Sequence, residues 1–257
     1  MTAQSTASIA AAGGRRNSLG DVALRRLKNK MRSWRRPETV AIDGVALRML
    51  YDQWSPEMVS RLLTHRYEAE ERALIPQVVK PGDRVLEIGG AIGLISLLCA
   101  RICGADNIFV YEANPDVLAA AQANYVENDA AISALHGAVV GDDFSGDAVE
   151  FFVHPNFWSS SLQDRQGAIR IEAPAFRIGD VIRRHRPTVL VMDVEGAEHA
   201  ILMNADLSSL SKLCIEFHTR YMGRPEANAL IKRLFDQGFL IDLELSKGET
   251  LFFERQA

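Results

Sequence analysis

The sequence contains few of the features that mark membrane-spanning, disulfide-rich or zinc-binding proteins. It has no run of roughly 18 apolar residues, which argues against a membrane-spanning helix. Its three cysteines, Cys99, Cys103 and Cys214, lie in apolar patterns without metal-ligand spacing, so we expect buried thiols in a reducing compartment. With 257 residues, 47% of them hydrophobic, the chain has the composition of a globular protein. We therefore expect a cytoplasmic protein.

Acidic residues are scarce at the N-terminus and abundant after it. Residues 1–36 carry a net charge of +8, and the remainder of the chain carries −12. A body this acidic is not expected to bind nucleic acid.

The basic N-terminal segment has a helical pattern in its second half. Apolar residues recur every three or four positions over residues 18–36, and Pro37 would end the helix. Such a helix could lie on an anionic membrane surface, serve as a transit peptide, or pack its apolar stripe on the protein. We expect disorder in residues 1–17 and treat 1–37 as an extension of the main domain.

Strands and helices are expected to alternate through the rest of the chain. The predicted strands are 40–45, 84–89, 107–113, 132–140, 148–154, 168–176, 188–193, 212–218, 239–245 and 250–254, and the predicted helices are 55–79, 93–103, 115–128, 178–185, 196–209 and 225–237. This order predicts an α/β fold, with a parallel sheet covered on both faces and a closing antiparallel hairpin. Residues 38–80 would form a hairpin and helix cap, and 81–257 the main domain.

The first predicted core strand ends in the glycine-rich turn Gly89-Gly-Ala-Ile-Gly93, and the second ends in Glu112. Glycines allow a ligand to approach the backbone, and a carboxylate at the second strand accepts hydrogen bonds from ribose hydroxyls. The turn departs from the Gly-x-Gly-x-x-Gly form, and Glu87 precedes it. A pyrophosphate is unfavourable beside that carboxylate, whereas the cationic, phosphate-free S-adenosylmethionine is not. Alone, either carboxylate could be a strand-end group with a structural role.

The chain resembles FkbM-type S-adenosylmethionine-dependent methyltransferases. The resemblance spans roughly residues 40–255 and is carried by Tyr67-Glu68, Val85-Leu-Glu-Ile-Gly-Gly-Ala-Ile-Gly93, Tyr111-Glu-Ala-Asn-Pro115, Met192-Asp-Val-Glu-Gly-Ala-Glu198 and Ile215-Glu-Phe-His218. It implies a Rossmann-like class I fold with a seven-stranded, mostly parallel sheet whose last strand is antiparallel, and it implies O-methylation of a hydroxyl. The family usually has Asp at position 87 and Gly-Ala-Asn at positions 89–91.

The candidate cofactor-binding residues come from these stretches. They are Glu87, Gly89, Ala91, Gly93, Glu112, Ala113, Asn114, Ala138, Val139, Tyr67 and Glu68. Tyr67 and Glu68 lie in a helical pattern; the resemblance places them near the amino-acid moiety of the cofactor, and the alternative is helix packing at the sheet edge. Ala138 and Val139 would line the adenine or belong to the core.

The candidate catalytic residues are Asp193, Glu195, Glu216 and His218, at the ends of two strands expected to be neighbours. Either His218 or Asp193 removes the proton of an acceptor hydroxyl, or Asp193, Glu216 and His218 bind a divalent ion such as Mg²⁺ that acidifies it. Glu198 is expected to stabilise a helix N-terminus.

The favoured function is O-methylation of a sugar, glycolipid or small natural product. The alternatives are an N- or C-methyltransferase acting on a small molecule or peptide, and a non-catalytic S-adenosylmethionine-binding protein. A nicotinamide-dependent oxidoreductase is disfavoured because the sequence has no Tyr-x-x-x-Lys pair. The expected partner is a small-molecule or glycan acceptor, with peripheral membrane contact through residues 18–36; the sequence leaves the oligomeric state open. The loop Trp158–Ser161 could cover the acceptor or be an exposed tip.

Overall fold

The computed structural model describes residues 36–153 and 169–256. The chain divides into two units, Met1–Arg36 and Pro37–Ala257, and the fold below is that of the second unit. The predicted N-terminal helix and the loop Trp158–Ser161 lie outside the described residues. Within them, no helix has the length and apolar character needed to cross a membrane.

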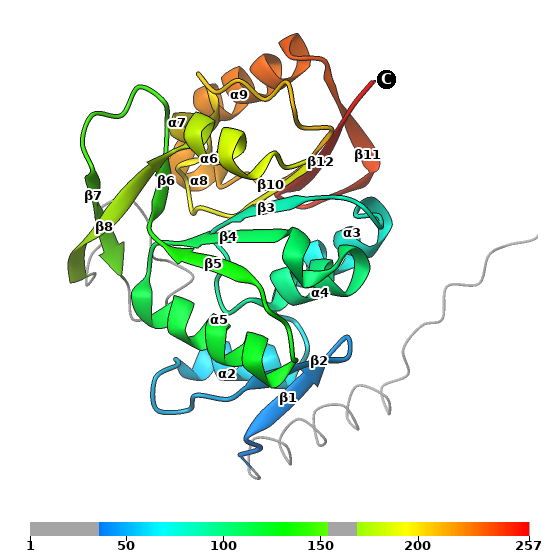
Figure 1. The fold of residues 1–257 in the computed structure, drawn as a ribbon, viewed down its shortest axis with the longest axis vertical. Coiled ribbons are helices and arrows are strands. Elements are labelled where there is room, and N and C mark those ends of the chain that lie inside the picture. Colours follow the sequence, from blue (N-terminus) through cyan, green and yellow to red (C-terminus); the bar gives the residue numbers. More distant parts are fainter. Residues whose placement is uncertain (1–35, 154–168, 257) are drawn as a thin grey trace, which may run out of the picture. The chain divides into compact units, whose positions relative to one another are not determined.

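The centre of the fold is a seven-stranded sheet in the order β11-β12-β10-β9-β3-β4-β5 (Figure 1). Five strands are parallel: β5 (Ser133–His136), β4 (Ile108–Glu112), β3 (Val85–Ile88), β9 (Val189–Met192) and β10 (Lys212–Glu216). The last strand, β12 (Thr250–Arg255), runs antiparallel between β10 and the edge strand β11 (Phe239–Lys247). The predicted fold class is confirmed.

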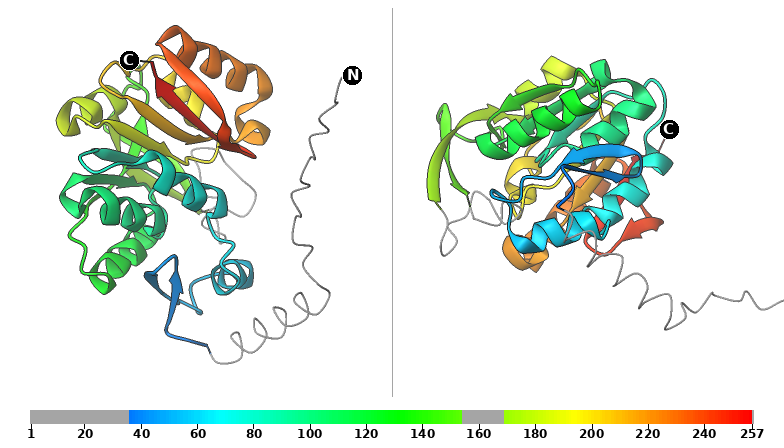
Figure 2. Two further views of the ribbon diagram at one scale, coloured as in Figure 1. Left: turned by 90° about the vertical axis from the view of Figure 1, so that its right-hand side faces the viewer. Right: turned by 90° about the horizontal axis from the view of Figure 1, so that it is seen from below.

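Neighbouring residues of the central strands enter different hydrophobic cores because strand side chains alternate between faces. Val85 and Val189 pack with α4 (Leu94–Cys103) and α5 (Pro115–Glu127), whereas Leu86 and Leu190 pack with α6 (Ile178–His185), α7 (Glu198–Leu202) and α9 (Arg224–Asp236). Figures 1 and 2 show helices on both sides of the sheet. Burial on both faces explains the continuous apolar runs in the sequence.

A hairpin and two helices precede the first core strand. The strands are β1 (Thr39–Ile42) and β2 (Val45–Arg48), and the helices are α2 (Pro56–Leu63) and α3 (Ala69–Val78). The predicted single helix 55–79 is therefore wrong, although Ser55 caps α2 as its side chain accepts a hydrogen bond from Met58 N. The guanidinium of Arg72 donates to the carbonyls of His65 and Tyr67, which stabilises the break between the helices.

The predicted strand 132–140 is divided at Gly137. Only β5 joins the main sheet, and β6 (Ala138–Val140) pairs instead with β8 (Ile169–Arg177), which pairs with β7 (Ala148–Val153). A Cβ at Gly137 would lie 2.4 Å from the Phe176 ring, so this crossing requires glycine.

The predicted helix 196–209 is shorter than expected, since α7 ends at Leu202. The side chain of Gln237 accepts from Leu207 N and donates to the carbonyl of Ala205, which satisfies backbone groups that a longer helix would pair internally. The remaining elements are the 3₁₀ turn η1 (Ala105–Asn107) and the short helix α8 (Thr219–Met222).

Two asparagines, Asn124 in α5 and Asn128 at the C-terminal cap of α5, attach the hairpin to the sheet domain. The amide of Asn128 accepts from Ala46 N at 3.0 Å and donates to Ala46 O at 2.7 Å. The fully buried amide of Asn124 accepts from Arg48 N and donates to Ile92 O, both at 2.9 Å. Asn124 therefore connects the hairpin to the glycine-rich turn.

We predict that Asn124→Ala lowers the free energy of unfolding by about 1–3 kcal/mol, because it removes the side-chain partner of the buried Ile92 carbonyl and of the Arg48 amide. Urea unfolding measures this change. Asn204→Ala is the matched control, since Asn204 is exposed and its amide bonds the exposed Asp143, and it should cost under about 0.5 kcal/mol. Equal effects in the two variants would contradict the prediction.

Candidate active site

A pocket of about 400 Å³ opens at the carboxyl ends of β3, β4 and β9. Most of the predicted site residues line it: Tyr67, Glu68, Gly89, Ala91, Glu112, Ala113, Ala138, Val139, Asp193, Glu195 and Glu216. The other four, Glu87, Gly93, Asn114 and His218, are not among the described residues that form its wall. The pocket thus brings the two predicted sets, cofactor-binding and catalytic, into one space.

Glu112 holds the glycine-rich turn against the end of β4. Its carboxylate accepts from Ala91 N at 3.0 Å and from Asn114 N at 2.8 Å. Burial raises the pKa of Glu112 to about 7, although these backbone donors oppose the shift. Asn114 is buried and caps α5, its side chain accepting from Asp116 N at 3.1 Å, so its position is structural.

The turn adopts backbone conformations that favour glycine. Gly89 has φ of 82°, and a Cβ there would lie 1.8 Å from the carbonyl oxygen of Asp193. Ala91 has φ of 43° in the left-handed region, where the resembling family has asparagine. Asparagine tolerates this region better than alanine, so the departure at position 91 carries a backbone cost.

Glu87 lies beneath the turn rather than on the pocket wall. It is buried, accepts a hydrogen bond from the hydroxyl of Ser96, and Ser96 in turn accepts from the Tyr125 hydroxyl at 2.9 Å. Burial raises the pKa of Glu87 to about 8 against the effect of Ser96. A Cβ at Gly93 would lie 2.4 Å from the Tyr125 ring, so the turn packs directly on this ring. Glu87 and Tyr125 therefore support the turn from beneath.

Tyr67 and Glu68 occupy the break between α2 and α3, not a helix as predicted. Glu68 has φ of 45° and precedes α3, and both residues line the pocket. Burial raises the pKa of the Glu68 carboxyl, and the Tyr67 hydroxyl opposes that shift. The left-handed turn is what brings these side chains to the pocket.

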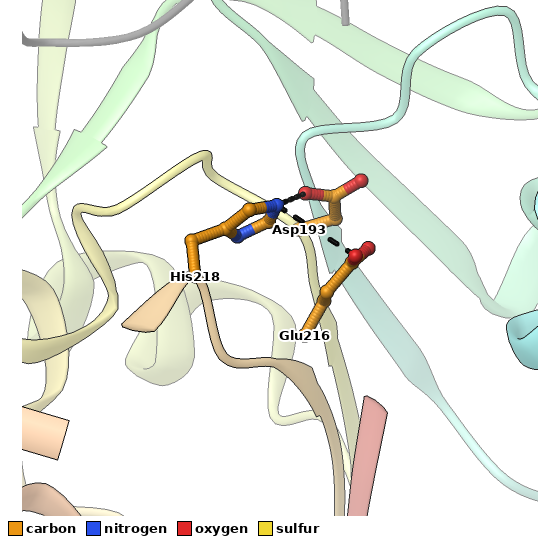
Figure 3. A group of neighbouring side chains, drawn as sticks. All are labelled: Asp193, Glu216 and His218. Atoms are coloured by element: carbon orange, nitrogen blue, oxygen red, sulfur yellow. Dashed lines mark ion pairs between the residues drawn. The ribbon is translucent and has the colours of Figure 1, made fainter. Parts of the chain in front are cut away.

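Four carboxylates surround the imidazole of His218. Its Nε2 lies 3.6 Å from Asp193 Oδ1, 3.6 Å from Glu195 Oε1 and 3.7 Å from Glu216 Oε1. Its Nδ1 lies 2.8 Å from Glu198 Oε1. Figure 3 shows His218 Nε2 directed between Asp193 and Glu216. The predicted catalytic residues Asp193, Glu195, Glu216 and His218 therefore lie close together, although β9 ends at Met192 and Glu195 reaches the cluster from a turn with φ of 54°.

Sequence reasoning missed two members of this acidic region. Glu198 begins α7 as expected, but it is fully buried and bonds both His218 Nδ1 and Gly196 N. Glu71 on α3 lines the pocket and its carboxyl bonds the Thr250 hydroxyl at 2.7 Å. The signal available for Glu198 was that it is the third acidic residue of Asp193-Val-Glu-Gly-Ala-Glu198, whereas Glu71 had no such signal.

The charges of the cluster perturb one another. Burial, together with the Glu216 carboxylate, raises the pKa of Asp193 well above its usual range, and burial with Glu71 raises that of Glu216 to about 7. Burial disfavours charge on His218, but the Glu198 hydrogen bond and the Asp193 carboxylate raise its pKa to about 10. Among the described residues lining the pocket, the cations are Arg61 and Arg66. The pocket is thus suited to a positively charged ligand.

The chain matches the methyltransferase FkbM domain over residues 87–241. Among solved structures it is similar to magnesium protoporphyrin IX methyltransferase from Synechocystis PCC 6803 with bound SAM (14% identity, 91% of this chain and 96% of that one, TM-score 0.46). It is also similar to precorrin-6y C5,15-methyltransferase from Geobacter metallireducens GS-15 (10% identity, 83% and 95%, TM-score 0.45). No curated protein matches the sequence.

The FkbM domain match makes the chain an S-adenosylmethionine-dependent methyltransferase, and its Rossmann-like sheet is the fold of that class. The chain belongs to the FkbM methyltransferase family, whose domain matches more than half of its length.

We predict that Glu112→Gln weakens binding of S-adenosylhomocysteine by about 1.5–3 kcal/mol, the range for a hydrogen bond to a charged group. If ribose hydroxyls donate to Glu112 they require the ionised carboxylate, so binding should release a proton. Affinity of the unaltered protein should fall as the pH drops through about 7, by up to about tenfold per unit. Calorimetry in buffers of different ionisation enthalpy measures both effects. The exposed Glu127→Gln serves as control; a pH profile that Glu112→Gln leaves unchanged would refute the assignment.

Proposed function

We propose that this methyltransferase transfers a methyl group to a hydroxyl of a sugar, a glycolipid or a small natural product. The observation that carries the proposal is the position of Asp193, Glu195 and Glu216 on the wall of the same pocket as the glycine-rich turn and Glu112. Carboxylates beside a methyl donor suit an acceptor whose proton must be removed.

The reaction is an in-line displacement that the pocket would align. The acceptor oxygen attacks the methyl carbon, the carbon–sulfur bond breaks, and S-adenosylhomocysteine leaves as a neutral thioether. The hydroxyl proton goes to a base. We assign that role to Asp193 rather than His218, because Asp193 lines the pocket and its side chain is 35% exposed, whereas that of His218 is 9% exposed.

A divalent ion is the alternative means of activating the hydroxyl. In that version Asp193, Glu216 and His218 hold an ion such as Mg²⁺, which lowers the pKa of the acceptor. Treatment with EDTA separates the two versions, since full activity without metal would leave only the base.

An N- or C-methyltransferase and a non-catalytic cofactor-binding protein are the competing functions. An amine acceptor needs little help in losing its proton, so Asp193 would matter less to it. A non-catalytic protein would bind S-adenosylmethionine and transfer nothing. Methyl transfer from labelled donor to fractionated cell extracts, followed by identification of the product, distinguishes all three.

The cellular setting is also a proposal. Free, buried Cys99, Cys103 and Cys214 suit the cytoplasm, and an acidic body argues against a nucleic-acid acceptor. Residues 18–36 would bring the enzyme to an anionic membrane carrying a glycolipid acceptor.

We predict that Asp193→Asn lowers kcat at least about 100-fold, because it removes the base while keeping the size of the side chain. Its affinity for S-adenosylhomocysteine should remain within about tenfold of the unaltered protein. Single-turnover methyl transfer and calorimetry measure the two quantities. Retained kcat in Asp193→Asn would remove the carboxylate from the mechanism and favour an amine acceptor.

A further inference from the structure

The arrangement around His218 has the organisation of a metal-ligand set. The side chains of His218, Asp193 and Glu216 each offer a ligand atom, and these atoms lie within 4.8 Å of one another. Glu195 Oε1 lies 3.6 Å from Nε2 of His218. Atoms bound at roughly 2.1 Å to a common ion are about 3.0–4.2 Å apart, so a small contraction would complete a coordination shell.

The described residues leave one of these ligand atoms without a hydrogen bond. Asp193 Oδ1 is shielded from solvent and has no hydrogen-bond partner in the described part of the chain. The contacts of His218 Nε2 with the carboxylates, at 3.6–3.7 Å, are longer than a hydrogen bond, although the side chain is nine-tenths buried. A buried polar atom without a partner is costly, and Figure 3 shows Nε2 directed toward Asp193 and Glu216.

Glu198 holds the imidazole as an outer carboxylate holds a metal-bound histidine. It accepts from Nδ1 at 2.8 Å, which directs Nε2 toward Asp193 and Glu216, so that Nε2 would present its lone pair there once a metal ion displaces its proton. Its own position is set by Gly196 N, which donates to the same oxygen at 3.0 Å. Such outer carboxylates fix the tautomer and orientation of metal-bound histidines.

From this geometry we infer that Asp193, Glu216 and His218 bind one divalent transition-metal ion of the Mn²⁺ type, with Glu198 as the positioning residue. Carboxylates alone would suit Mg²⁺ or Ca²⁺, but an imidazole ligand shifts the preference toward first-row transition metals. With the ion bound, Asp193 is a ligand rather than the base, so the inference deepens the metal version of the proposed function, whereas binding of the ion does not depend on that function.

Titration of the metal-stripped full-length protein with Mn²⁺ alone, followed by electron paramagnetic resonance, tests the inference. We expect one Mn²⁺ per chain, with nitrogen modulation from a directly bound imidazole in the pulsed spectrum. Excess Mg²⁺ should compete poorly. Absence of bound Mn²⁺, or bound Mn²⁺ without the nitrogen signal, would overturn the inference, and the spectrum needs no variant that might fail to fold.

Substitutions then assign the ligands. Asp193→Asn, Glu216→Gln and His218→Gln should each weaken Mn²⁺ binding at least about tenfold, and Glu198→Gln about 10–100-fold with a changed nitrogen signal. Glu244→Gln, an exposed carboxylate on β11, should bind Mn²⁺ as the unaltered protein does. Equal Mn²⁺ affinity in all variants would place the ion elsewhere. Mn²⁺ binding without methyl transfer would refute only the proposed function, and methyl transfer without Mn²⁺ binding only this inference.

Discussion

The contact between Gly89 and the backbone of Asp193 is the constraint on which the site depends. The amide of Asp193 donates to Ile88 O at 3.1 Å and that of Gly89 donates to Tyr111 O at 2.9 Å, so the pairing of β3 with both neighbours continues past the strand ends. Since a Cβ at Gly89 would lie 1.8 Å from Asp193 O, only glycine permits this approach. The glycine-rich turn and the segment that begins at Asp193 are therefore held together by main chain, so the backbone fixes the separation of Gly89 and Asp193.

Much of this arrangement could be predicted because it follows from strand ends. The carboxyl ends of parallel strands lie at one edge of the sheet, so the sequence predicts that Glu112, Asp193 and Glu216 lie near one another. All three line the pocket. The apolar runs predicted the strands of the sheet, and the glycines at positions 89–93 predicted the turn after β3. Elements whose ends are set by distant side chains could not be predicted. The break before α3 depends on Arg72, and the early end of α7 depends on Gln237; neither leaves a local signal such as proline or glycine.

The same distinction separates the predicted site residues from the missed ones. Glu198 looked like a helix-terminal carboxylate and does begin α7, but its contact with His218 joins positions 20 residues apart. Glu71 and Thr250, 179 residues apart, meet because β12 lies beside β10, a register that periodicity does not specify. Conversely Glu87, assigned to the cofactor, packs beneath the turn with Ser96, because its strand position faces the α4 side of the sheet. Residue type and position along a strand predict which chemical groups lie near the site. Packing decides on which face of the sheet each side chain lies and which partner it contacts.

The accumulation of carboxylates has a consequence for the protein without ligand. Below about pH 4.5 Glu87 and Glu112 are protonated whether the chain is folded or not, and they contribute nothing to pH-dependent stability. As the pH rises, the unfolded chain loses these protons while the folded chain keeps them up to about pH 8 for Glu87 and about 7 for Glu112, so the free energy of unfolding falls across this interval. A ligand that brings positive charge or hydroxyl donors favours the ionised carboxylates and reverses part of that loss. S-adenosylmethionine brings both, so the acidity that weakens the empty pocket strengthens its hold on the methyl donor.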